Sequence, residues 1–134
     1  MARRFLPVLV AMALIAVGVG LLLGEQHERR SRLEDRVVAM TGGDPQAGRA
    51  AIQKRPCGSC HTIPGISGAK ASVGPPLTQF GGRGYIAGRL ENTPDNLVRW
   101  LKDPHQVDPQ SAMPRMGIGE KEARDMAAYL YTLT

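Results

Sequence analysis

The chain has 134 residues, of which 43% are apolar and only 4% aromatic, and it carries a formal net charge of +5. This length and composition fit one small domain plus a further segment rather than two domains. With so few aromatic side chains to stack on bases and no recognised nucleic-acid motif, binding to DNA or RNA is a poor explanation of the basic charge.

The first 24 residues indicate a membrane helix. Arg3 and Arg4 precede an apolar run at residues 5–23, and the sequence turns strongly charged from Glu25. Nineteen apolar residues make a helix of about 28 Å, close to the hydrocarbon thickness of about 30 Å and longer than the run of about 7–15 residues in a cleaved signal. We therefore expect residues 1–24 to be an uncleaved anchor. Cleavage after Gly20 is the alternative, and it would leave Leu21 and its neighbours exposed.

Residues 25–43 are expected to form a linker between this anchor and a domain at residues 44–134. Leu33, Val37 and Val38 have helical spacing, so the anchor helix is expected to continue for a few turns before Gly42 and Gly43 break it.

Capping signals predict helices in the domain. Asp44 before Pro45 begins one that runs to about Lys54, and Thr93 before Pro94 begins a second. The second helix carries an apolar stripe and is ended by a further proline, Pro104, and a last helix begins near Glu120. No strand pattern is evident, which predicts an all-α domain.

Between the first two helices lies the sequence Cys57-Gly58-Ser59-Cys60-His61. C-x-x-C-H is the signature for covalent attachment of a c-type haem. Residues three and four apart in one turn lie side by side, so both cysteine sulfurs can bond the two vinyl groups of one porphyrin. His61 is then placed to bind the iron as the axial ligand.

Other chemistries of two cysteines are less consistent with the sequence. A disulfide between Cys57 and Cys60 would close too small a loop to constrain the unfolded chain. A redox-active dithiol usually follows an apolar strand, whereas Lys54 and Arg55 precede the motif. Zinc requires four ligands, and His27 and His105 are far away in sequence.

Iron bound by His61 needs a second axial ligand, for which Met113, Met116 and His105 are candidates. Residues 107–119 are rich in proline and glycine, and such an irregular backbone can bring a thioether over a porphyrin. This favours Met113, with Met116 as the alternative.

From Asp44 onward, about two-thirds of the chain, the sequence resembles a class I (mitochondrial-type) cytochrome c. It is most similar to membrane-anchored bacterial forms and to the cytochrome domains joined to haem–copper oxidase subunits. The resemblance implies the small all-α class I cytochrome c fold around one covalent haem c, preceded here by an N-terminal transmembrane helix. The motifs that match are Cys57-x-x-Cys60-His61, Gly74-Pro75-x-Leu77, Gly82-Arg83, Trp100-Leu101-x-x-Pro104, Ala112-Met113-Pro114 and Ala127-Ala128-Tyr129-Leu130.

Roles for individual residues follow from this resemblance. It implies Met113 as the second iron ligand and a hydrogen bond from the ring of His61 to the carbonyl of Pro75. It also implies that Arg83 faces a haem propionate and that Trp100 lines the pocket on the methionine side.

The resemblance further implies that the first and last helices of the domain cross at a small residue, with Gly48 against Tyr129 and Leu130. Beyond Arg83, Tyr85 is a candidate for a second propionate contact.

Histidine and methionine on the two faces of the iron leave no site for a small-molecule substrate. We therefore expect an electron-transfer protein rather than an enzyme, one that carries single electrons from a quinol-oxidising complex toward a terminal haem–copper oxidase. Because thioether attachment takes place outside the bacterial cytoplasmic membrane, the haem domain is expected on the periplasmic or outer face, held by a single membrane pass.

Two other functions remain open at this stage: a tightly bound haem subunit of an oxidase or quinol-oxidising complex, and a thiol–disulfide oxidoreductase. For the carrier, we expect the basic residues Lys54, Arg55 and Arg115 to rim the haem edge and steer the domain toward an acidic partner. The alternative is that these are ordinary solvated charges.

Overall fold

A computed structural model describes residues 6–134 of the chain. Residues 1–5, with Arg3 and Arg4 of the expected membrane signal, lie outside the described residues. The chain divides into two compact units, Met1–Leu33 and Glu34–Thr134, and the cytochrome-like motifs all lie in the second.

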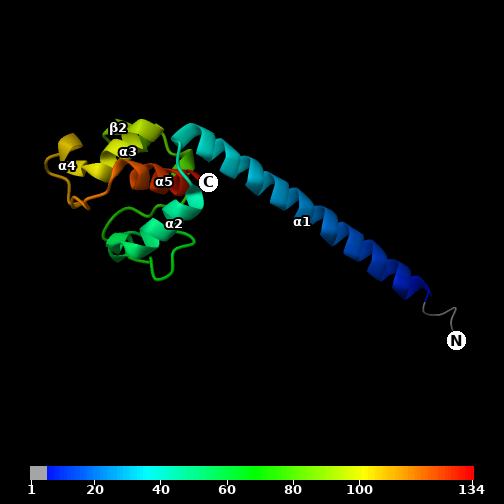
Figure 1. Cartoon of the computed structure of the whole chain (residues 1–134). Coiled ribbons are helices and arrows are strands. Elements are labelled where there is room, and N and C mark those ends of the chain that lie inside the picture. Colours follow the sequence, from blue (N-terminus) through cyan, green and yellow to red (C-terminus); the bar gives the residue numbers. More distant parts are fainter. Residues whose placement is uncertain (1–5) are drawn as a thin grey trace. The chain divides into compact units, whose positions relative to one another are not determined.

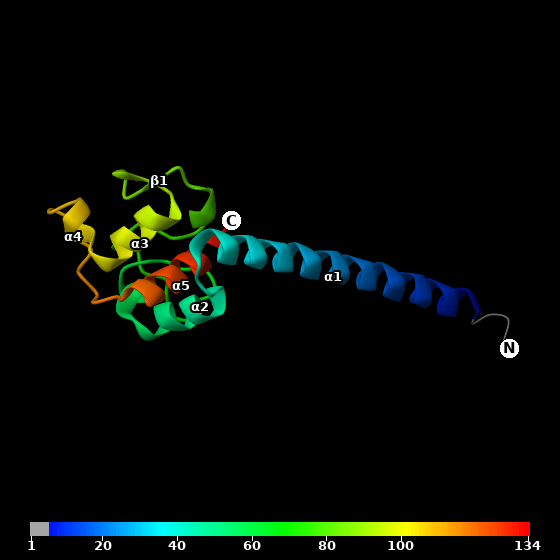
Figure 2. The same cartoon turned by 45° about the horizontal axis from the view of Figure 1, so that its top comes forward.

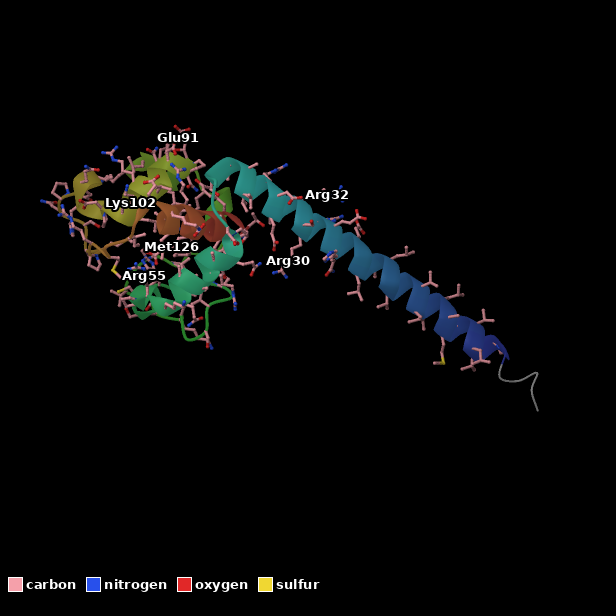
Figure 3. All side chains as sticks on the ribbon, viewed as in Figure 1. Arg30, Arg32, Arg55, Glu91, Lys102 and Met126 are labelled. Atoms are coloured by element: carbon pink, nitrogen blue, oxygen red, sulfur yellow. The ribbon has the colours of Figure 1, made fainter. Side chains whose placement is uncertain are left out.

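Helix α1 (Leu6–Thr41) contains residues 6–23 of the apolar run (Figures 1 and 3). Its most apolar window has a mean hydropathy of 2.5 with no residue buried, so it is long and apolar enough to cross a membrane. The charged residues that follow continue the helix, with pairs Glu25–Arg29 at 2.6 Å and Glu28–Arg32 at 3.1 Å at helical i,i+4 spacing. The helical part of the expected linker therefore reaches Thr41.

Four further helices build the second unit: α2 (Pro45–Lys54), α3 (Pro94–Lys102), the single turn α4 (Pro104–Val107) and α5 (Glu120–Tyr131). The predicted caps are present. The carboxylate of Asp44 accepts from the backbone N–H groups of Gln46 (2.8 Å) and Ala47 (3.3 Å), and the hydroxyl of Thr93 accepts from that of Asn96. Two short 3₁₀ turns, η2 (Pro56–Ser59) and η3 (Phe80–Gly82), connect these elements.

Helix α5 is the centre of the unit and lies between α2 and α3 (Figures 1 and 2). Gly48 of α2 packs so closely on α5 that a methyl group there would overlap the carbonyl oxygen of Asp125 and lie 2.9 Å from the nitrogen of Met126. The small residue at the crossing is therefore present as expected, but the backbone that it meets lies about one turn before the expected Tyr129 and Leu130. The apolar core is formed mainly by buried residues of α3 and α5: Leu97, Val98, Leu101, Ala123, Met126, Ala127, Ala128 and Leu130.

The mostly helical unit also contains a short antiparallel hairpin, β1 (Tyr85–Ile86) with β2 (Leu90–Glu91). The expectation that the sequence forms no strand was therefore wrong. Strands of two residues have no measurable alternation, so hydrophobic periodicity does not detect them. The turn uses positive φ angles at Ala87 (49°) and Gly88 (67°).

The loop after the cysteine motif is irregular, but hydrogen bonds and buried side chains hold it firmly. Ile63, Ile66 and Ala69 are buried. The guanidinium of Arg49 donates twice to the carbonyl of Gly65 (3.0 and 2.7 Å), and the hydroxyl of Tyr129 donates to that of Pro64 (2.6 Å). Helices α2 and α5 thus fix the loop from two sides.

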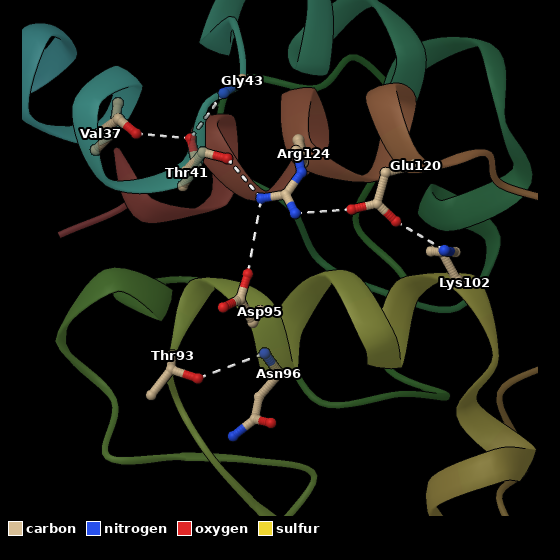
Figure 4. A network of polar contacts seen from close by, with 9 residues as sticks. All are labelled: Val37, Thr41, Gly43, Thr93, Asp95, Asn96, Lys102, Glu120 and Arg124. Atoms are coloured by element: carbon tan, nitrogen blue, oxygen red, sulfur yellow. Dashed lines mark hydrogen bonds and ion pairs between the residues drawn. The ribbon is translucent and has the colours of Figure 1, made fainter.

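The C-terminal end of α1 is part of the same folded unit. Val37 and Thr41 are each only 1% exposed. Helix α1 ends where Gly42 takes a φ of +67° and its N–H donates to the carbonyl of Val38 (2.9 Å). The guanidinium of Arg124 in α5 donates to the carbonyl of Thr41 (3.1 Å), as Figure 4 shows.

A second contact fixes the next residues of the chain. The N–H of Asp44 donates to the carboxylate of Asp125 (2.9 Å), which is 6% exposed and also pairs with Lys121 (2.6 Å). A methyl group on Gly43 would lie 2.6 Å from the nitrogen of Asp125. Residues 41–44 therefore lie directly against α5.

Candidate haem-binding site

The cysteine motif forms a tight turn directly after α2. Arg55 leaves the helix in an extended conformation, and η2 then places the backbone N–H groups of Cys60 (3.2 Å) and His61 (3.0 Å) on the carbonyl of Cys57. Both cysteines are half-buried and neither is in a disulfide. The two thiols and the imidazole are thus presented from one turn of backbone.

A neighbouring segment orients the His61 ring. Backbone bonds from Gly74 to Cys60 (2.7 Å) and from Leu77 to Thr62 (2.8 Å) hold residues 74–77 beside residues 60–62. Nδ1 of His61 consequently lies 2.7 Å from the carbonyl oxygen of Pro75. Because a carbonyl only accepts, Nδ1 is the protonated nitrogen and Nε2 keeps its lone pair.

Gly74 determines how close this segment comes to the imidazole. A methyl group at Gly74 would lie 2.5 Å from Cε1 and 2.8 Å from Nδ1 of His61. Only a residue without a side chain fits there while the ring keeps its position. The requirement for glycine is thus steric.

The distal candidates lie in the irregular segment between α4 and α5. Met113 is half-buried, and its N–H donates to the hydroxyl of Ser111 (3.2 Å). Nε2 of His105 lies 3.0 Å from the carbonyl oxygen of Ser111, so the imidazole is engaged inside this segment. Met116 is half-buried as well.

Within residues 6–134, no hydrogen bond or ion pair joins Arg83 or Trp100 to the cysteine motif. Nη2 of Arg83 donates to the carbonyls of Pro76 and Thr78 (2.9 Å to the latter), and its guanidinium lies 5.6 Å from the centre of the Phe80 ring. Trp100 is half-buried on α3.

The three basic residues expected around the haem edge differ in their surroundings. Arg55 is bonded to Glu122 and is only 24% exposed, so the expectation of a free docking charge was wrong for this residue. Arg115 is 63% exposed and pairs with Asp103 at 2.8 Å. Lys54 is exposed and makes no hydrogen bond or ion pair with any other described residue.

The competing chemistries find little support in this geometry. Burial raises the pKa of the Cys57 thiol, which disfavours the reactive thiolate of a dithiol enzyme. Within residues 6–134, no group of three or more His, Cys, Asp and Glu side chains is arranged to hold a metal ion. Zinc bound by the cysteines is therefore not supported.

The residues present do fit covalent haem. Two half-buried thiols without a disulfide and an imidazole whose Nε2 is left free by Pro75 supply the chemistry that attachment and iron ligation require. Between the motif and α3, two large apolar side chains are strongly exposed, Val73 at 83% and Tyr85 at 68%.

Comparisons with known proteins agree with this fit. A family model described as Cytochrome c matches residues 45–134. The chain is also similar to proteins named cytochrome c oxidase subunit 2. It is 36% identical to that of Alkalihalophilus pseudofirmus over 64% of this chain and 25% of that protein. It is 38% identical to that of Bacillus sp. PS3 over 47% of this chain and 18% of that protein. The subunit of Bacillus subtilis is 33% identical over 57% of this chain and 23% of its own length.

The chain thus spans about a quarter or less of the length of these relatives. No solved structure matches it. The family model covers most of the chain, including the cysteine motif and the helices on either side of it. Covalent haem c is therefore the implied cofactor. The chain belongs to the cytochrome c family.

Proposed function

We propose that this chain is a membrane-anchored mono-haem cytochrome c that carries single electrons in a respiratory chain, from a quinol-oxidising complex toward a terminal haem–copper oxidase. The observation that carries the proposal is the 2.7 Å contact between Nδ1 of His61 and the Pro75 carbonyl, which leaves Nε2 available as an iron ligand beside two free cysteines. Haem electron transfer is also the function common to its family.

Each proposed site residue has a defined task. Cys57 and Cys60 attach the porphyrin through thioether bonds, and His61 binds the iron in the orientation that the carbonyl of Pro75 fixes. Met113 would supply a second iron ligand, a soft thioether that favours the reduced iron and raises its potential. When bound, the haem supplies a one-electron Fe(III)/Fe(II) couple.

Arg83 and Trp100 are proposed to complete the pocket. The carbonyls of Pro76 and Thr78 both accept from Nη2 of Arg83, so Nε and Nη1 remain available as donors to a haem propionate. Trp100 is proposed to line the methionine side, since it belongs to the same helix as the buried Leu97 and Leu101.

The membrane location rests on α1, whose apolar window is long enough to span a bilayer. We place the domain on the periplasmic or outer face of the cytoplasmic membrane, since this is where thioether attachment takes place. Residues 1–24 would be the anchor, residues 25–43 the linker and residues 44–134 the cytochrome domain, with the last part of the linker, residues 34–43, folded into the same unit as the domain.

Covalent haem is tested directly by denaturing gel electrophoresis. Wild-type protein should retain haem-dependent peroxidase stain, and the double variant Cys57→Ala/Cys60→Ala should lose it. Stain that acid acetone extracts from the wild-type protein would disprove covalent attachment.

The choice of partner is tested by stopped-flow oxidation of the reduced full-length protein by a membrane haem–copper oxidase. Since Lys54 and Arg115 are exposed cations, the second-order rate should fall with ionic strength and in the Lys54→Glu variant. A rate too slow for turnover at any salt concentration would refute the oxidase as electron acceptor.

A second candidate function is a permanent haem subunit of an oxidase. It is favoured by the relatives, in which the matching segment is part of a protein named cytochrome c oxidase subunit 2. Gentle solubilisation followed by native electrophoresis separates the two functions. A carrier migrates alone as a small red band, whereas a subunit migrates with a large complex.

A further inference from the structure

One side chain joins the segment before the cysteine motif to the segment that carries the distal methionines. Nε and Nη2 of Arg55 donate to the two carboxylate oxygens of Glu122 in α5, at 2.8 and 2.6 Å. Its Nη1 donates to the carbonyl oxygen of Met116 at 2.6 Å. Arg55, labelled in Figure 3 beside the end of α2, thus bonds both the distal segment and α5, which lie 61 and 67 residues further along the chain.

The bond to Met116 fixes the backbone of the distal segment, in which the side chain of Arg115 also pairs with Asp103 at 2.8 Å. On its N-terminal side this segment is held by the bond between His105 and Ser111. On its C-terminal side, Pro114 is exposed and Gly117 turns the chain with a φ of +63°. Among the described residues, Arg55 is the side chain that bonds the backbone of the stretch between Met113 and the buried Ile118.

The environment of the guanidinium favours a firm contact. The side chains of Arg55 and Glu122 are 24% and 33% exposed, so water screens the pair only in part. Their mutual hydrogen bonds are the leading cause that raises the pKa of Arg55 and lowers that of Glu122. Because Nε and Nη2 both bond the carboxylate, the planar guanidinium is oriented so that Nη1 points at the carbonyl of Met116.

We propose that Arg55 is a positioning residue for Met113. By holding the carbonyl of Met116, three residues after the ligand, it keeps the distal segment closed and sets how readily Met113 leaves the iron. The inference rests on the proposed function, in which Met113 is the distal ligand. It replaces the role in partner docking that the sequence suggested for Arg55.

Ligand competition in the ferric full-length protein measures this opening. Added imidazole can bind the iron only where Met113 has left, so its apparent affinity reports the open fraction. Arg55→Lys keeps the positive charge but cannot bridge a carboxylate and a carbonyl in one plane. We expect imidazole to bind about tenfold more tightly to this variant, equivalent to about 1.4 kcal/mol.

Two further variants separate the carbonyl contact from a general loss of stability. Glu122→Gln leaves Arg55 free to move, and the apparent affinity for imidazole should rise about threefold, since neutral hydrogen bonds are weaker than charge-assisted ones. Lys102→Gln is the control. It removes an ion pair of similar length, 2.7 Å, between Lys102 of α3 and Glu120 of α5, and Lys102 has no hydrogen bond or ion pair to the distal segment. Its imidazole affinity should equal that of the wild type.

A second readout separates this inference from the function on which it rests. Ferric iron with a thioether ligand has a weak far-red charge-transfer band, which should be present in the wild type and absent from Met113→Ala. A wild type without this band would overturn the assignment of Met113 and, with it, the role of Arg55. With the band present, unchanged imidazole affinity in both Arg55→Lys and Glu122→Gln would overturn the role of Arg55 alone, whatever their melting temperatures.

Discussion

Replacing Gly74 by alanine should directly disturb His61, the proposed iron ligand. The added methyl group would lie 2.5 Å from Cε1 of His61, whereas ordinary van der Waals contacts begin at 3.4 Å, so the ring would have to retreat by about 0.9 Å. The backbone at Gly74 cannot easily move instead, because its N–H is bonded to the carbonyl of Cys60 at 2.7 Å. A retreat of that size breaks the 2.7 Å bond to Pro75, since N–H···O bonds weaken beyond about 3.2 Å.

The lost hydrogen bond costs about 1 kcal/mol and the overpacking about 2 kcal/mol. For a domain of this size each kcal/mol lowers the melting temperature by about 4–8 °C. Gly74→Ala should therefore melt about 12–24 °C below the wild type when the full-length holoprotein is heated and followed by haem absorbance. Gly82→Ala is the matched control, since a methyl group at Gly82 meets no atom within 4 Å and its φ is ordinary. If both variants melted together and kept the same reduction potential, the steric argument would be refuted.

Three more changes test other parts of the structure. Met113→His should keep the iron six-coordinate and lower its reduction potential substantially, within the range of about 0.8 V that axial ligands span. Met116→Leu should have little effect on the potential in the same potentiometric titration. The reverse pattern would contradict the ligand assignment. Because Arg55 lowers the pKa of Glu122, the pair contributes stability that is fully present above the ordinary glutamate value of 4.5 and is lost as the pH falls through the lowered value. Thermal melts should then separate wild type from Glu122→Gln at pH 7 and superimpose them in strong acid. Gly48→Ala should lower the melting temperature more than any exposed Gly→Ala change, because its methyl group overlaps the backbone of α5; an unchanged melt would mean that the two helices separate at no cost.

The elements that the sequence predicted are those determined by neighbouring residues. Asp44 and Thr93 cap their helices through bonds to residues two and three positions ahead, so their roles were evident from the local sequence. The motif from Cys57 to His61 was recognised in the same way.

Contacts between distant residues were not predicted from local patterns. Arg55 bonds Met116 and Glu122 across 61 and 67 residues, and nothing in a single sequence pairs these positions. The bond between His61 and Pro75 spans 14 residues and was expected only from the family resemblance. Its physical cause, two backbone bonds that lay residues 74–77 beside residues 60–62, is visible only in the fold.

If the chain is the membrane-anchored carrier proposed above, the contacts at the end of α1 bear on how it searches for its partner. Two consecutive glycines after a membrane helix suggest a swivel, about which a domain would sweep a large volume and meet partners at many angles. Here Thr41 and Asp44, on either side of the glycines, are bonded to Arg124 and Asp125 of α5, and Gly43 is buried. A swivel at this point would have to break those bonds first, so we expect any hinge to lie before Glu34. A soluble fragment for kinetic work should accordingly begin at or before Glu34, because one that begins at Asp44 would lack the buried Val37 and the Thr41 carbonyl to which Arg124 of α5 donates.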